Sequence, residues 1–191
     1  MFQREIDHET EVRALTERDA GEMFRLTDSN RFHLREWLPW LDTTVSEEDT
    51  RRFIQGGIEQ DAANLGFQAG IFWSGLLVGQ IGFHKIDWAN RRVMLGYWLG
   101  APYVGRGFVT RAAIVLTDHA LREYALNRVE IHSAAGNARS RTVAERLRYT
   151  LEGIEREGEA LYGRYVDLAV YSMLASEWKN KRPASFTSHS Q

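Results

Sequence analysis

Two glycines that flank an arginine are the first residues whose types and spacing indicate a binding site. Gly105, Arg106 and Gly107 lie between an apolar stretch, residues 92–99, and an amphipathic stretch that begins at Phe108. Glycines let a ligand approach the backbone closely, and the first turn of a helix offers unpaired N–H groups and a positive dipole end. The segment therefore predicts a cradle for a phosphate or pyrophosphate, although the glycines could equally serve only to form a turn.

This loop departs from the two common nucleotide-binding motifs. It is not a Walker A motif because no Gly-Lys-Ser/Thr follows it, and Thr110 stands where a dinucleotide fingerprint requires a third small residue. That departure argues against a nucleotide-binding domain in which Glu130 would contact a ribose.

Three glutamates, Glu155, Glu157 and Glu159, recur at every second position of residues 151–161, a stretch typical of a strand. In a regular strand they lie on one face, where mutual repulsion would raise their pKa values. A carboxylate with a raised pKa can act as a general base near neutral pH. The pattern alone favours another interpretation, in which the charges keep a solvated edge strand from aggregating. The spacing does not identify which glutamate would be the base.

An aromatic segment, residues 31–41, carries Trp37 and Trp40 on either side of Pro39. Proline interrupts a helix, so this segment is predicted to be a bent helix and loop. The tryptophans would form either a wall of a substrate site or a hydrophobic plug between two helices, and the sequence does not favour one over the other.

The elements that must position these residues follow from hydrophobic periodicity and capping signals. Strands are predicted at residues 10–15, 65–72, 76–85, 92–99, 129–133, 151–161 and 165–174, and helices at 16–30, 46–63, 108–122 and 137–147. This order predicts an α+β fold with a mostly antiparallel sheet and one central parallel βαβ unit. We expect a single domain over residues 1–178 and a frayed tail over residues 179–191.

Composition excludes several classes of function. The chain has 191 residues and a net charge of −2, so it lacks the basic character of a protein that binds nucleic acid. No apolar run is long enough to span a membrane, and the N-terminus is too charged for a signal peptide. The absence of cysteine excludes thiolate sites and fits a reducing cytoplasm. The six histidines show no i, i+4 pairing, so no metal site is predicted.

Taken together, these segments resemble the GNAT superfamily of N-acetyltransferases, and within it the RimJ/RimL type, which acetylates the N-termini of ribosomal proteins. The resemblance runs from about Val12 to Trp178. Its most specific parts are residues 95–99 (Leu-Gly-Tyr-Trp-Leu), Gly105-Arg-Gly107, Asn137 with Ser140, and residues 151–153 (Leu-Glu-Gly) with Glu159 downstream. Val104 and Val109 depart from the residues that usually flank the family's glycine loop.

The resemblance implies a GNAT-like three-layer fold whose sheet is splayed to hold acetyl-CoA, with no metal. The pantetheine arm would lie between strands 92–99 and 128–134 and bond to Asn137. A backbone amide near Trp98 or Leu99 would polarise the thioester carbonyl. The donor site would comprise Tyr97, Trp98, Leu99 and Asn137, with the pyrophosphate on Val104, Gly105, Arg106, Gly107 and Phe108.

The resemblance also implies the catalytic roles. A glutamate matching Glu159 acts as base in RimL-like enzymes, and a serine matching Ser140 acts as acid. Because a hydroxyl is a weak acid, Ser140 would more readily donate a hydrogen bond to the departing thiolate, or it could serve only to start a helix. Trp37, Trp40 and Glu157 would contact the acceptor.

The expected acceptor is the N-terminal amine of a ribosomal protein in the cytoplasm, and a homodimer is consistent with the RimL type. One alternative is a small amine, such as an antibiotic, a polyamine or an amino acid. Another is a non-catalytic acyl-CoA-binding module, against which the presence of both Ser140 and Glu159 argues.

Overall fold

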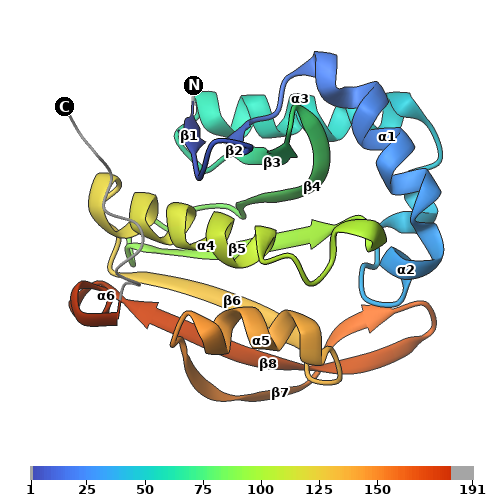
Figure 1. Cartoon of the computed structure of the whole chain (residues 1–191). Coiled ribbons are helices and arrows are strands. Elements are labelled where there is room, and N and C mark those ends of the chain that lie inside the picture. Colours follow the sequence, from blue (N-terminus) through green and yellow to red (C-terminus); the bar gives the residue numbers. More distant parts are fainter. Residues whose placement is uncertain (1, 182–191) are drawn as a thin grey trace.

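A computed structural model describes residues 2–181 and arranges eight strands in one sheet. The order across the sheet is β1-β2-β3-β4-β5-β6-β8-β7 (Figure 1). The strands are β1 (Gln3–Glu5), β2 (Thr10–Ala14), β3 (Gln68–Trp73), β4 (Leu76–Phe83), β5 (Arg92–Leu99), β6 (Arg128–Ala134), β7 (Thr150–Leu161) and β8 (Arg164–Leu174). The helices are α1 (Ala20–Ser29), α2 (Arg31–Arg35), α3 (Glu47–Ala62), α4 (Phe108–Asp118), α5 (Ala138–Arg146) and α6 (Ala175–Lys181).

The central pair, β5 and β6, is parallel, and every other neighbouring pair in the sheet is antiparallel. Pairing between β5 and β6 covers three residues of each strand and ends at Met94 opposite Glu130. Beyond that point the two strands diverge (Figure 1). The predicted α+β sheet with one parallel βαβ unit is therefore confirmed, and it contains an opening at its centre.

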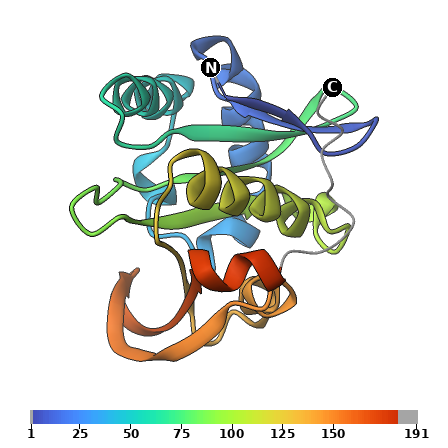
Figure 2. The same ribbon diagram turned by 90° about the vertical axis from the view of Figure 1, so that its left-hand side faces the viewer.

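Helices cover both faces of the sheet, which makes three layers. On one face α4 packs on the strands through a core that includes Ala112, Leu116, Leu95 and Ile131. On the other face α1 and α3 pack against Trp98 and its neighbours. Figure 2 shows α3 and α4 on opposite sides of β3. Successive side chains of a strand point to opposite faces of the sheet. The side chains of β5 therefore contribute alternately to the two cores, with Leu95 in one and Trp98 in the other.

Local signals start the helices where the sequence predicts. The Ser46 hydroxyl accepts a hydrogen bond from the Asp49 N–H at 3.2 Å, and the Asp49 carboxylate accepts one from the Ser46 N–H at 2.8 Å. This reciprocal pair is a capping box that satisfies N–H groups at the start of α3. None of the helices in the described part of the chain has the length and apolar character needed to cross a membrane.

Three details differ from the predicted elements. A short strand, β1, precedes the first predicted strand and pairs with β2. The helix expected to reach residue 122 ends as α-helix at Asp118 and continues as a π-helical turn. Residues 179–181 of the predicted frayed tail belong instead to α6, and its other residues, 182–191, lie outside the described part of the chain.

Candidate active site

A cleft of about 1120 Å³ runs through the opening between β5 and β6. On the α4 and α5 side it is lined by the glycine loop, Asn137 and Ser140. On the α1–α3 side it is lined by aromatic side chains, among them Trp37, Trp40 and Phe53. The cleft therefore joins the two faces of the sheet, so that two molecules entering from opposite sides could meet at the opening.

The glycine loop has the backbone geometry of an anion cradle. Gly105 and Gly107 have φ angles of +84° and +79°, a left-handed conformation that side chains disfavour. A Cβ on Gly105 would meet no atom within 4 Å, so conformation, not space, requires glycine there. Gly107 caps the start of α4, whose first N–H groups have no side-chain partner at that cap. The glycine loop therefore lies at the cleft, and its use as a phosphate cradle stays a prediction.

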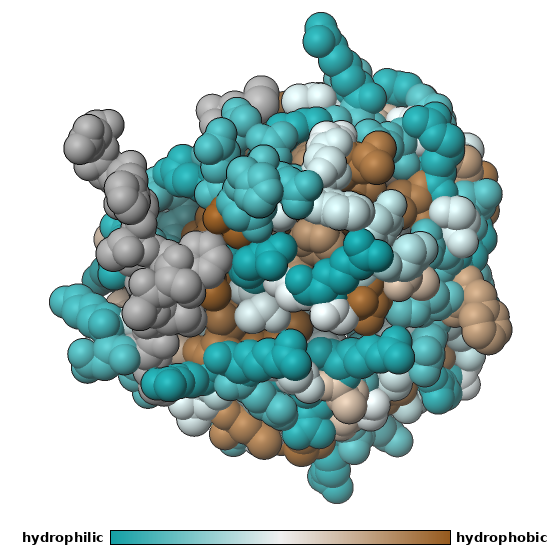
Figure 3. Space-filling view, in the orientation of Figure 1, coloured by the Kyte–Doolittle hydropathy of each residue, from teal (hydrophilic) through white to brown (hydrophobic). Residues whose placement is uncertain are grey.

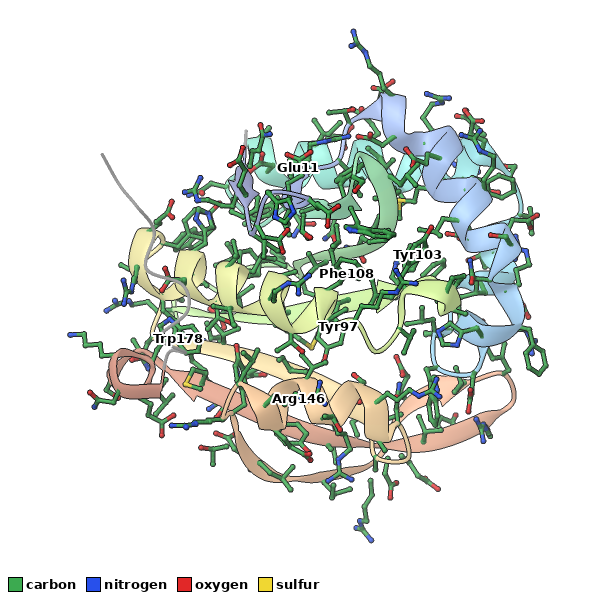
Figure 4. All side chains as sticks on the ribbon, in the orientation of Figure 1. Glu11, Tyr97, Tyr103, Phe108, Arg146 and Trp178 are labelled. Carbon is green, nitrogen blue, oxygen red and sulfur yellow. The ribbon has the colours of Figure 1, made fainter. Side chains whose placement is uncertain are left out.

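Arginines near this loop do not lie where the sequence suggested. Arg106 is exposed, and its guanidinium carbon stacks over Trp73, 5.1 Å from the ring centroid, so its side chain is not among those that line the cleft. Two arginines of α5, Arg139 and Arg146, do line it. Figure 3 shows polar side chains in teal around small apolar areas on this face, and Figure 4 shows Arg146 on α5. The sequence predicted that Arg139 and Arg146 share a helix, but nothing in it indicated that they line the cleft.

Ser140 and Tyr97 are hydrogen-bonded to each other at the opening. The Ser140 hydroxyl donates to the Tyr97 oxygen at 3.2 Å, and the Tyr97 hydroxyl donates to the Ser140 carbonyl at 3.0 Å. Figure 4 shows Tyr97 between α4 and α5. Burial raises the pKa of Tyr97 to about 12, so this phenol keeps its proton at neutral pH. The Asn137 side-chain oxygen accepts from the Ser140 N–H at 3.1 Å, and this bond caps α5.

The backbone of β5 offers donors to the opening. The Gly100 N–H donates to the Val78 carbonyl of β4 at 3.0 Å. Because N–H groups along a strand alternate between its two edges, the N–H of Leu99 points away from β4 and into the gap. Of the two amides that the sequence proposed, Leu99 therefore has the orientation to bind a thioester oxygen, and Trp98 faces β4.

Of the three alternating glutamates, Glu159 alone among the described residues lines the cleft. The expected regular strand is wrong, because β7 bulges between Glu155, which pairs with Leu168, and Glu159, which pairs with Val166. Glu157 occupies the bulge with a φ of +53°, is exposed, and donates its N–H to Asp167 at 2.8 Å. Burial, and not repulsion between neighbours, raises the pKa of Glu159.

The aromatic segment closes the cleft from the α2 side. Helix α2 ends at Arg35, before Pro39, as the sequence predicts. The Trp40 ring lies 6.1 Å from the Trp98 ring, and a Cβ on Gly136 would lie 3.5 Å from the ring of Trp37. Both tryptophans therefore line the cleft, and Trp40 also packs against the apolar cluster that contains Trp98. A substrate-binding role for them stays a prediction.

A tyrosine at the tip of the β7–β8 hairpin holds this segment in place. The Tyr162 hydroxyl donates to the Leu38 carbonyl at 2.6 Å and accepts from the Leu41 N–H at 3.2 Å. The Arg35 guanidinium stacks on the Tyr162 ring at 3.7 Å and pairs with Asp42 at 2.8 Å. We call Tyr162, Arg35, Leu38 and Leu41 the hairpin latch. Contacts across more than a hundred residues leave no signal in the sequence.

Two histidines on the floor of the cleft were also missed by the sequence reasoning. His84 and His132 both line the cleft on the α1–α3 side of the sheet. His132 contacts Glu130 at 2.9 Å through its Nε2 atom. Residues 2–181 contain no group of three or more histidine or acidic side chains placed to hold a metal ion.

Comparisons with known proteins agree with this geometry. Residues 10–150 match the family model described as "Acetyltransferase (GNAT) domain". The chain is 34% identical over 95% of its length to the whole of "Putative ribosomal N-acetyltransferase YdaF" of Bacillus subtilis (strain 168). It is 29% identical to "Ribosomal-protein-serine acetyltransferase" of Escherichia coli (strain K12), covering 88% of this chain and 94% of that protein.

A solved structure extends the comparison to the fold and the donor. The ribosomal L7/L12 alpha-N-protein acetyltransferase RimL, in complex with coenzyme A, superimposes with a TM-score of 0.87 at 28% identity. The match covers 91% of this chain and 98% of that chain.

Proposed function

The chain belongs to the GNAT acetyltransferase family, and from that premise we propose that it moves the acetyl group of acetyl-CoA to a protein N-terminal amine. The observation that carries this proposal is the cleft that joins the glycine loop to Glu159 through the opening between β5 and β6. A donor and an acceptor that enter from opposite faces can then react directly, with no covalent intermediate on the protein.

Acetyl-CoA occupies the α4 and α5 side in this proposal. Its pyrophosphate binds the amides of residues 104–108 at the start of α4, where the helix dipole favours negative charge. Arg139 and Arg146 add positive charge on the same side. The pantetheine arm enters the gap between the diverging strands, and the Leu99 amide stabilises the oxyanion that forms on the thioester carbonyl.

The acceptor occupies the α1–α3 side. A protein N-terminus is an ammonium group at neutral pH, since its pKa is about 8. Glu159 attracts this cation and removes a proton, and its raised pKa makes it a better proton acceptor than an ordinary carboxylate. Trp37 and Trp40 contact the first residues of the acceptor chain.

The thiolate that leaves is stabilised at the Ser140 and Tyr97 pair. In this structure the Ser140 hydroxyl donates its hydrogen to Tyr97. When the thiolate forms, the hydroxyl turns and donates to the sulfur instead. Tyr97 keeps its proton at neutral pH and donates it to the Ser140 carbonyl, so the phenol holds the serine in position at the opening. Ser140 therefore acts as a hydrogen-bond donor in the first place, which agrees with the weak acidity of a hydroxyl.

The name of one relative indicates a class of acceptor. The Escherichia coli relative is named for ribosomal-protein serine, so we propose a ribosomal protein that begins with serine, modified in the cytoplasm where ribosomes are made.

The test is thiol release from acetyl-CoA with peptides that begin with Ser, Ala or Met and with a panel of small amines. Turnover on the Ser peptide supports the proposal. Turnover on small amines alone would mean that the acceptor is a small amine and not a protein N-terminus. Acetyl-CoA binding without turnover on any amine identifies a binding module and contradicts the proposal.

A further inference from the structure

His84 lies at the edge of the opening, on the acceptor side. A Cβ on Gly96 would lie 2.8 Å from the His84 Nε2 atom, so the imidazole rests on the β5 backbone where a side chain is absent. Gly96 is two residues beyond Met94, the last residue of β5 that pairs with β6. It shares a face with Trp98, which packs against α1 and α3. The imidazole therefore stands over the gap on the face that the acceptor enters.

His84 differs from its neighbour His132 in its hydrogen bonds. The Nε2 atom of His132 contacts the Glu130 carboxylate, which in turn accepts from Arg128 at 2.6 Å. Neither ring nitrogen of His84 has a hydrogen-bond partner among residues 2–181. A ring that is accessible from the cleft and has both nitrogens free is available to a substrate.

The surroundings of His84 favour its neutral form. His84 is exposed to the cleft, but the protein around the ring partly desolvates it, and this desolvation, followed by the nearby His132, lowers the pKa of His84. The titratable and charged groups that line the same cleft are His132 on β6, Arg52 and Asp49 on α3, His33 and Glu36 at α2, Glu159 on β7, and Arg139 and Arg146 on α5. Arg52 is paired with Asp49, so the group that faces His84 as an electrostatic neighbour is His132. At neutral pH, His84 can therefore accept a proton.

Amide formation from an ammonium group requires two protons to leave the nitrogen. The first leaves before attack, when the ammonium becomes a neutral amine. The nitrogen lone pair then forms the N–C bond, the carbonyl becomes an oxyanion, and the nitrogen carries a positive charge until a second proton leaves. The carbonyl reforms as the C–S bond breaks, and coenzyme A leaves as a thiolate that accepts a hydrogen bond from Ser140 and then takes a proton from water. The two protons that left the nitrogen pass to acceptors on the protein and from there to water, so one proton is released overall.

We propose that His84 accepts the second proton, the one that leaves the nitrogen of the tetrahedral intermediate. This role rests on the proposed acetyl transfer and gives the two proton acceptors different steps. Glu159 lies on the β7–β8 hairpin and receives the ammonium group as it enters, whereas His84 lies over the gap where the thioester carbon is attacked. His132 is held by Glu130 and remains outside the proton transfer in this proposal.

The experiment measures kcat and KM against pH for the wild type, His84→Asn and the matched control His8→Asn, with a peptide that begins with Ser. His8 is a suitable control because its side chain is 88% exposed, in the turn that joins β1 and β2. We expect His84→Asn to lower kcat by about 100-fold, the usual contribution of a general base, with a much smaller change in KM. The acid limb of kcat should report two ionisations in the wild type and one in His84→Asn.

Chemical rescue separates a proton acceptor from a structural residue. His84→Ala leaves space over Gly96, so imidazole added to the buffer should restore part of the lost kcat. Acetyl-CoA affinity, measured by calorimetry, should be unchanged in both variants because the ring lies on the acceptor face.

Three results would overturn the role of His84. They are a kcat for His84→Asn within about twofold of the wild type, an acid limb identical to that of the wild type, and a His84→Ala variant that imidazole does not rescue. Absence of wild-type turnover on every amine would instead overturn the proposed function, and the role of His84 with it.

Discussion

The two sides of the opening are built in different ways. In the proposed arrangement, the donor side is built mainly by one segment, residues 97–108, together with the start of α5. The acceptor side consists of side chains that come from α2, the end of β4, β6 and the β7–β8 hairpin. A backbone cradle suits a donor whose phosphates and carrier arm are always the same. A wall of side chains that come from distant parts of the sequence can differ between proteins that use different acceptors. Variants on the two sides should therefore affect different substrates.

The largest effect is expected from Glu159→Gln, which keeps the shape of the side chain and removes its charge. We expect kcat to fall by about 100-fold or more, because a general base is lost, while acetyl-CoA affinity stays the same. Thiol release and calorimetry measure the two quantities.

Glu155→Gln is the matched control, since Glu155 precedes the bulge and lies outside the cleft lining. Loss of activity in Glu155→Gln equal to that in Glu159→Gln would remove the special role of Glu159.

The next effect concerns the donor side. Gly107→Ala places a Cβ at a φ of +79°, which strains the backbone by about 1 kcal/mol and moves the amides at the start of α4. We expect acetyl-CoA to bind about fivefold more weakly, with the peptide KM unchanged.

Gly153→Ala provides the control, because Gly153 has no neighbour within 4 Å of a Cβ and lies on β7. If Gly107→Ala raised the peptide KM and left the acetyl-CoA affinity unaltered, the glycine loop would belong to the acceptor side and not to the donor side.

A smaller effect is expected from Tyr162→Phe, which removes both hydrogen bonds of the hairpin latch and keeps the ring under Arg35. Each hydrogen bond contributes about 1 kcal/mol, so we expect modest destabilisation and a peptide KM that rises about threefold. Urea denaturation and steady-state kinetics measure these changes. The exposed Tyr165 serves as control through Tyr165→Phe, and equal effects in the two variants would show that the latch does not hold the acceptor wall.

The smallest effect concerns stability and has the opposite sign. The pKa of Glu159 is raised in the folded protein, so the native state holds this proton more tightly than the unfolded state. Its contribution to stability is therefore present at pH below the unfolded pKa and is lost as the pH rises through the folded pKa. Glu159→Gln should have a Tm above that of the wild type at pH 7 and equal to it near pH 4. A lower Tm at pH 7 would contradict the burial of a charged Glu159.

The loop and the helix start on the proposed donor side could be located from the sequence because their signals are local, whereas the arginines that line this side could not. Gly105 and Gly107 mark the loop, and Asn137 and Ser140 mark the start of α5 within four residues. The fold class followed in the same way from the strand and helix periods.

Most of the acceptor side could not be predicted, since its contacts join residues far apart in the chain. Tyr162 bonds Leu38 across 124 positions, and His84 stands beside His132 through the folding of the sheet. The bulge that separates Glu157 from Glu159 depends on the pairing of β7 with β8. The regular alternation of the glutamates in the sequence gives no sign of it.

The most direct test of the central claim is to locate the acetyl group on a product. The enzyme is incubated with acetyl-CoA and a peptide that begins with Ser and contains an internal lysine, and tandem mass spectrometry then identifies the modified nitrogen. The proposed arrangement predicts acetylation of the α-amine alone, with little product from Glu159→Gln. Acetylation of the lysine, or equal product from the variant, would contradict it.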